Sequence, residues 1–172
     1  MTVHAFVDES KRNGLVLVAA VVAESDLAAT RAAMRRLCLR GQSRVHFTKE
    51  GRRRRGEIAT TICGTSVVVD IYDGTALRGE ATARSACLEQ IVADLDAGGC
   101  RRLVIEQDDA MLATDQAVLY RAVHKLGTRL EYVHQRPSQD PLLWIADAAA
   151  WCWTRPGERY RIRPIVRNVW VA

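Results

Sequence analysis

The order of the apolar segments limits most strongly how this chain can fold. Residues 3–10 begin with a short apolar run and end in polar residues, a turn containing Asn13 and Gly14 follows, and a second apolar run covers residues 15–23. Two such runs around an Asn-Gly turn predict an antiparallel hairpin. After the hairpin, strand-like and helix-like segments alternate. This order predicts an α/β fold, a mixed β-sheet with helices on both faces, in one domain spanning residues 1–172.

The later elements are assigned from the spacing of their apolar side chains. Apolar residues that recur every three or four positions predict helices, and clusters of β-branched residues predict strands. The first helix is expected to start at Ser25-Asp26 and to end at Gly41. Further helices are expected at 48–62, 81–96, 114–126 and 141–153, and further strands at 65–72, 101–107 and 130–134. The helix at 141–153 is apolar nearly all the way round, which predicts that it is buried.

Composition excludes several classes of protein. No apolar run approaches the roughly 20 residues needed to cross a bilayer, and the N-terminus lacks the basic and apolar regions of a signal peptide. We therefore expect a cytoplasmic protein with no membrane partner. The five cysteines include no C-x-x-C pair, which predicts reduced thiols rather than disulfides or a zinc site. The chain also lacks the motifs of P-loop, dinucleotide-binding and serine-hydrolase enzymes.

Carboxylates end two of the predicted strands. Asp8 and Glu9 close the first strand, and Glu106 closes the strand at 101–107, with Asp108 and Asp109 just beyond it. If these strands are parallel neighbours, Asp8 and Glu106 meet at the same edge of the sheet. The alternative without a functional role is that Asp8 and Glu9 are turn residues. Asp108 or Asp109 would replace Glu106 if the strand ended later than we place it.

Asp147 is the single charged residue inside the apolar helix at 141–153. A buried carboxylate costs several kcal/mol unless an arginine, hydrogen bonds, a proton or a metal ion compensates it. A structural salt bridge, for example with Arg101 or Arg129, and a metal site are both open at this point. Three converging carboxylates repel one another, and a divalent cation would hold them together.

Basic residues suggest a polyanionic partner. The net charge is +5, and Arg52, Arg53, Arg54 and Arg55 form an uninterrupted block. Together with Lys11 and Lys49 they are candidate contacts to a nucleic-acid backbone, and a solvated helix face is the alternative. The apolar ending Val169-Trp170-Val171 is expected either to dock in the core or to form a homodimer contact.

Four short motifs resemble those of a bacterial and phage family catalogued as domain of unknown function 3800. They are Asp8-Glu9-Ser10, His46, Glu106 and Ala146-Asp147, and they extend over nearly the whole chain. That family looks like the ribonuclease H superfamily, so the resemblance implies a ribonuclease H-like fold. Lys11 departs from the family pattern, which has a glycine at this position.

The resemblance implies a metal-dependent nuclease that cleaves DNA or RNA phosphodiesters with two Mg²⁺ or Mn²⁺ ions. Asp8, Glu106 and Asp147 match the three metal-binding positions in order, with Glu9 and Asp109 as further candidate ligands. His46 would position water or contact phosphate, or else be a structural histidine. The rival hypothesis is a binding module of the same fold without turnover, for nucleic acid or protein, in a defence or mobile-element system.

Overall fold

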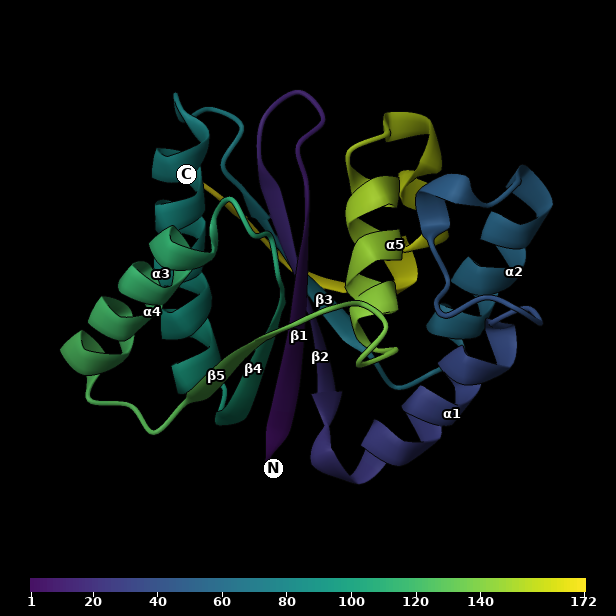
Figure 1. Ribbon diagram of the computed structural model, residues 1–172, viewed down its shortest axis with the longest axis horizontal. Helices are drawn as coiled ribbons and strands as arrows, with labels where there is room; N and C mark the ends of the chain where they lie inside the picture. Colours follow the sequence, from purple (N-terminus) through teal and green to yellow (C-terminus); the bar gives the residue numbers. More distant parts are fainter.

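A six-stranded sheet with helices on both faces forms the centre of the computed structural model, which describes all 172 residues (Figure 1). The strands run in the order β5-β4-β1-β2-β3-β6. This confirms the predicted α/β class and mixed sheet. The strands are β1 (Val3–Ser10), β2 (Val16–Ala23), β3 (Val68–Asp73), β4 (Cys100–Glu106), β5 (Glu131–Gln135) and β6 (Val166–Val171). The α-helices are α1 (Leu27–Leu37), α2 (Arg52–Cys63), α3 (Glu80–Ala97), α4 (Leu112–Leu126) and α5 (Leu143–Trp153).

β1 lies between β2 and β4 and fixes both halves of the sheet. It pairs with β2 in the antiparallel direction and with β4 in the parallel direction. The hairpin turn needs left-handed backbone at Asn13 (φ 59°) and Gly14 (φ 111°), conformations that Asn and Gly adopt most easily. Because β1 and β4 are parallel neighbours, their carboxyl ends meet at one edge of the sheet. This is the arrangement that we expected to bring Asp8 and Glu106 together.

Each face of the sheet has its own hydrophobic core. Phe6 and Val104 belong to the core beneath α5, whereas Ala5, Val7 and Ile105 belong to the core beneath α3 and α4. In Figure 1, α1, α2 and α5 cover one face and α3 and α4 cover the other. Successive residues of a strand point to opposite faces of the sheet. The face of each further strand residue therefore follows from the core to which its neighbours belong.

Two helix boundaries differ from the predicted ones by a full turn. The basic helix begins at Arg52 rather than at residue 48, because Phe47–Lys49 form a separate 3₁₀ turn and Gly51 is extended (φ −75°, ψ 165°). The first helix ends at Leu37 rather than near Gly41, because Cys38 is already extended (ψ 124°). None of the helices combines the length and the apolar character needed to cross a membrane.

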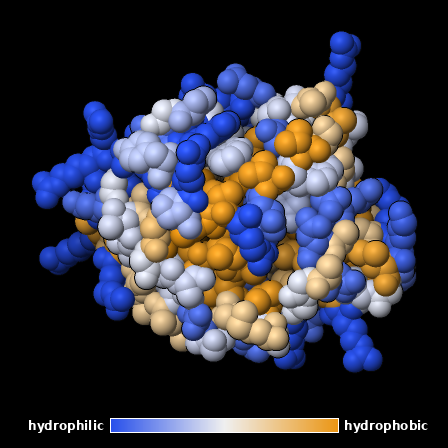
Figure 2. Space-filling model, turned by 180° about the vertical axis from the view of Figure 1, so that it is seen from behind, coloured by the Kyte–Doolittle hydropathy of each residue, from blue (hydrophilic) through white to orange (hydrophobic).

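The C-terminal segment forms β6, the edge strand beside β3. Trp170 packs near Tyr72, with ring centroids 6.3 Å apart, and Arg167 donates hydrogen bonds to Asp70. The ending therefore pairs with the sheet as an edge strand, and of its three apolar residues Trp170 packs against a core. Val169 and Val171 remain exposed. Figure 2, which views the molecule from behind, shows apolar side chains across the middle of that face with hydrophilic ones around them.

Candidate metal centre

Asp8, Glu106 and Asp147 lie on the α5 face of the sheet. Asp8 and Glu106 come two residues after Phe6 and Val104, so strand alternation gives them the same side as those two core residues. Asp147 is on α5, the helix that packs on β1 and β2. Its Oδ2 accepts a hydrogen bond from the backbone N–H of Phe47 at 3.2 Å. The fold thus brings together three carboxylates that lie far apart in the sequence.

The three carboxylates lie close enough together for their charges to act on one another. The pKa of Asp8 is raised well above its usual range, first by burial and then by the charges of Glu106 and Asp147. Burial also raises the pKa of Asp147, while the N–H of Phe47 and the charge of Arg44 act in the opposite direction. Both neighbouring carboxylates therefore make ionisation of Asp8 less favourable, which is the situation that a bound cation relieves.

Arg44 supplies the nearby positive charge. Its Nη2 lies 3.5 Å from Asp147 Oδ2 and its Nη1 lies 3.9 Å from Glu106 Oε1. Neither Arg101 nor Arg129 forms an ion pair with Asp147. One guanidinium faces three carboxyl groups, and Glu106 Oε2 is buried without a hydrogen-bond partner. This donor set fits a hard divalent cation such as Mg²⁺ or Mn²⁺, which prefers carboxylate oxygens.

His46 lies close to this group. It directly precedes Phe47, whose N–H holds Asp147, and its charge when protonated would lower the pKa of Asp147. The imidazole is partly exposed. His46 is therefore beside the carboxylates, at the border between the α5 face and solvent.

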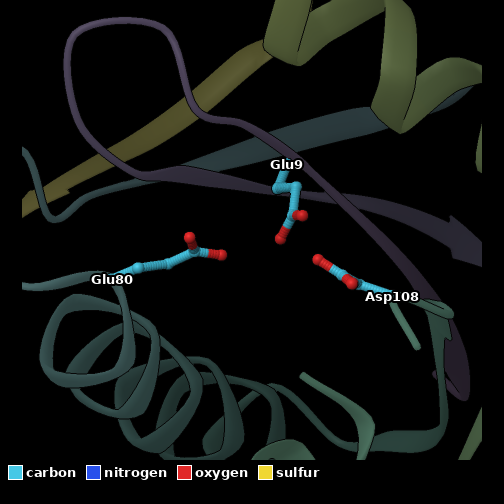
Figure 3. Close-up of side chains that lie close together, drawn as sticks. All are labelled: Glu9, Glu80 and Asp108. Carbon is cyan, nitrogen blue, oxygen red and sulfur yellow. The ribbon is translucent and has the colours of Figure 1, made fainter. Parts of the chain in front are cut away.

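A second acidic group lies on the opposite face of the sheet (Figure 3). Oxygens of Glu9, Glu80 and Asp108 all come within 4.8 Å of one another. The ammonium of Lys11 is 3.3 Å from Glu9, 2.6 Å from Glu80 and 2.8 Å from Asp108. Glu9 also pairs with Arg84. Two side-chain cations, those of Lys11 and Arg84, thus already balance these carboxylates.

The two remaining acidic candidates do not join the group on the α5 face. Glu9 follows Asp8 and so points to the α3 side, where Arg84 and Lys11 hold it. Asp109 is exposed and pairs with Arg136 at 3.0 Å. The three carboxylates on the α5 face are less tightly gathered than the second acidic group, because their oxygens do not all lie within 4.8 Å of one another.

Sequence reasoning missed a buried charge network under α3 and α4. Arg84 donates to Asp115 at 2.5 and 2.9 Å, and His134 Nε2 lies 3.1 Å from the same carboxylate. The side chains of Arg84 and Asp115 are 1% and 0% exposed. Arg84 and Asp115 lie near the starts of α3 and α4, in line with the buried apolar residues of each helix. A charged residue in line with an apolar helical stripe is the sequence signal that could have found these two residues.

The predicted basic contacts have different surroundings. Lys11 is engaged by the second acidic group, and Arg53 and Arg54 both pair with Glu57. Lys49 and Arg52 are exposed and form no ion pair. Arg55 donates to the carbonyls of Phe47 and Thr48. The uninterrupted block is therefore not a single surface, since its members point to different partners.

Comparison with solved structures supports the fold. The chain is similar to ribonuclease HII from Archaeoglobus fulgidus, solved in a complex with PCNA, with a TM-score of 0.57 and 19% identity. The similarity covers 94% of this chain and 75% of that one. At this identity the likeness concerns the fold, and it confirms the predicted ribonuclease H-like architecture. No family model and no curated protein matches the chain, so membership of the domain of unknown function 3800 family is not confirmed.

Proposed function

We propose that the protein is a metal-dependent nuclease that hydrolyses phosphodiester bonds of DNA or RNA. The observation that carries the proposal is the convergence of Asp8, Glu106 and Asp147 on one face, with a single arginine among them. The fold shared with a ribonuclease HII supports it. Glu106 Oε2 is buried without a hydrogen-bond partner, and a cation bound at this place would supply a partner for it.

Asp8 is the central ligand in this proposal, because the charges of both other carboxylates act on it. Glu106 and Asp147 lie on either side of Arg44 and would each complete one coordination sphere. Two Mg²⁺ or Mn²⁺ ions in such a site supply Lewis acidity, lower the pKa of a water nucleophile and stabilise the leaving oxygen.

The chain's own groups prepare the site in three ways. Arg44 and the N–H of Phe47 fix the orientation of Asp147, and α5 excludes water from its inner side. Asp8 keeps its proton more readily than an ordinary aspartate, so cation binding is coupled to loss of that proton. His46 stands beside Asp147, where it can orient water or a phosphate oxygen.

A cleavage panel tests this function. Labelled single-stranded, duplex, hybrid and branched DNA and RNA are incubated with wild-type protein, Asp8→Asn and the control Asp96→Asn, whose carboxylate is exposed on α3. We expect cleavage that needs Mg²⁺ or Mn²⁺, is abolished by EDTA and is lost in Asp8→Asn but kept in the control. Equal background cleavage by all three proteins would refute it.

A second function has one observation in its favour. Arg44 already lies 3.5 Å from Asp147, as a binding module without turnover would require. In that case millimolar Mg²⁺ or Mn²⁺ should leave the melting temperature unchanged, because only a ligand of the folded state stabilises it. A rise in the melting temperature of the wild type that is absent from Asp8→Asn would favour the nuclease.

A further inference from the structure

The guanidinium groups of two arginines lie against a tryptophan that is one helical turn beyond Asp147. Trp151 follows Asp147 by four residues on α5, so the two lie on the same side of the helix. The guanidinium carbon of Arg55 is 4.3 Å from the centre of a Trp151 ring, and that of Arg155 is 4.1 Å away. Such cation–π contacts hold arginine side chains in place without neutralising their charge.

The β1–β2 hairpin brings a third arginine to the same place. Ser10 Oγ and Thr154 Oγ1 are hydrogen-bonded at 3.1 Å, which joins the end of β1 to the end of α5. The backbone N–H of Arg12 donates to the same Ser10 oxygen at 3.4 Å, and Arg155 follows Thr154 directly. Burial lowers the pKa of Arg155, and the charges of Arg12 and Arg55 lower it further. Arg12 and Arg55 therefore each lie close enough to Arg155 for their charges to act on it.

These arginines lack carboxylate partners. None of Arg12, Arg55 and Arg155 forms an ion pair, although most of the other arginines around the candidate metal centre do. Glu158, whose charge acts on Arg155, is held by Arg161 at 2.5 Å. The Arg155 side chain donates only to the Trp151 carbonyl, and the Arg12 side chain donates to nothing. Several N–H donors are thus free to bind an anion.

A helix end explains only part of this cluster. Arg155 lies where a cation stabilises the C-terminus of α5, and that role needs neither Arg12 nor Arg55. Three unpaired arginines held together by an indole and a hairpin match the bidentate recognition of phosphate. A turn of helix rises about 5.4 Å, so Trp151, around which the cluster is arranged, lies within one or two nucleotides of a phosphate placed at Asp147.

We propose that Arg12, Arg55 and Arg155, arranged around Trp151, bind a backbone phosphate of the nucleic-acid strand next to the phosphate that faces Asp8 and Asp147. The choice of a nucleic acid as the ligand rests on the proposed function. The cluster contacts the backbone and not the bases, so it contributes affinity and position rather than sequence specificity.

Equilibrium binding without cleavage tests the cluster. Fluorescence anisotropy measures the affinity of wild-type protein, Arg12→Gln, Arg155→Gln and the double variant for labelled single-stranded and duplex DNA and RNA in EDTA, over a range of salt concentrations. Arg121→Gln is the control, because Arg121 is exposed on α4 and forms no ion pair. Thermal melting of each variant verifies that it is folded. Arg12 is exposed on a hairpin, so its replacement leaves the fold intact even if that of Arg155 does not.

We expect each single substitution to weaken binding about tenfold, the effect of one charge-assisted hydrogen bond. The slope of log affinity against log salt should become shallower by about 0.7–0.9 for each phosphate that the variant no longer binds, while the control binds like wild type. Wild-type affinity and slope in Arg12→Gln and the double variant would overturn the inference, and so would an absence of oligonucleotide binding by the wild type.

The two proposals fail separately. If Asp8→Asn abolishes cleavage while the arginine variants bind as tightly as wild type, the cluster is refuted and the nuclease stands. If the wild type cleaves nothing and the arginine variants bind more weakly, the nuclease is refuted and the cluster stands.

Discussion

Replacing Lys11 with methionine removes the ammonium that balances the second acidic group. Methionine keeps an unbranched apolar side chain that is one heavy atom shorter, and it lacks the ammonium with its charge and its N–H donors. In the wild type this ammonium contacts Glu9, Glu80 and Asp108 at 2.6–3.3 Å. Its removal leaves three carboxylates whose oxygens lie within 4.8 Å of one another, with Arg84 on Glu9 as the remaining cation.

The expected loss of stability is modest, because the group is partly exposed. The Lys11 side chain is 44% exposed, and those of its partners are 16–41% exposed. Exposed ion pairs contribute about 0.2–1 kcal/mol each, so three pairs and the uncovered repulsion amount to about 2 kcal/mol. In a chain of 172 residues this lowers the melting temperature by about 4–8 °C.

A divalent ion should then replace the ammonium. Mn²⁺ at tenfold excess over its dissociation constant would restore about 1.4 kcal/mol. The shift is measured by calorimetry in the Asp8→Asn background, with and without Lys11→Met, so that the α5 face does not contribute. Lys125→Met, an exposed lysine without an ion pair, is the control. An unchanged melting temperature in Lys11→Met, or no response of that variant to Mn²⁺, would refute the account of Lys11 as the resident cation.

Three further substitutions test the packing and charge of the fold. Asp115→Asn should cost about 3–5 kcal/mol in urea unfolding, because it leaves the buried Arg84 without its main partner; a loss below about 1 kcal/mol would contradict this. Burial would raise the pKa of Asp115, but His134 and Arg84 hold it below its usual value. Its contribution is therefore complete above the unfolded pKa and disappears as the pH falls through the lower folded value, so the stability of Asp115→Asn should lack that part of the acid dependence. Gly14→Ala should cost about 1–3 kcal/mol, since φ is 111° and a Cβ would meet Thr75 Cα at 2.9 Å; a melting temperature equal to wild type would show that the hairpin relaxes. Asp8→Asn should raise the melting temperature in EDTA at neutral pH, because the raised pKa of Asp8 makes the folded state lose stability as the pH rises above the ordinary carboxyl range; a lower melting temperature would show that Asp8 stabilises the metal-free fold.

The sequence predicted the order of the first five strands and the five helices, but not β6, because the main signals of those elements are local. The Asn13-Gly14 turn, the apolar strands and the apolar α5 each follow from neighbouring residues. The convergence of Asp8 with Glu106 needed one further fact, that β1 and β4 are parallel neighbours. A carboxylate inside an apolar helix was sufficient to single out Asp147, whose place beside the other two depends on how α5 packs on the sheet.

What sequence reasoning left out depends on contacts between distant segments. Arg44 lies in an irregular stretch after α1, and no local pattern connects it with Asp147. The Arg84–Asp115 pair joins two helices, and the role of Lys11 requires Glu80 and Asp108 to meet Glu9. Strand alternation alone separates Glu9 from Asp8, so that part of the site could be predicted once β1 was assigned.

The anomalous diffraction of crystals grown with Mn²⁺ tests the central claim most directly, because it locates the ions without reference to activity. We predict that the anomalous peaks lie among Asp8, Glu106 and Asp147 on the α5 face, and that Arg44 moves away from Asp147. Peaks only among Glu9, Glu80 and Asp108, or no peak at saturating Mn²⁺, would contradict a metal centre on the α5 face and the nuclease mechanism that depends on it.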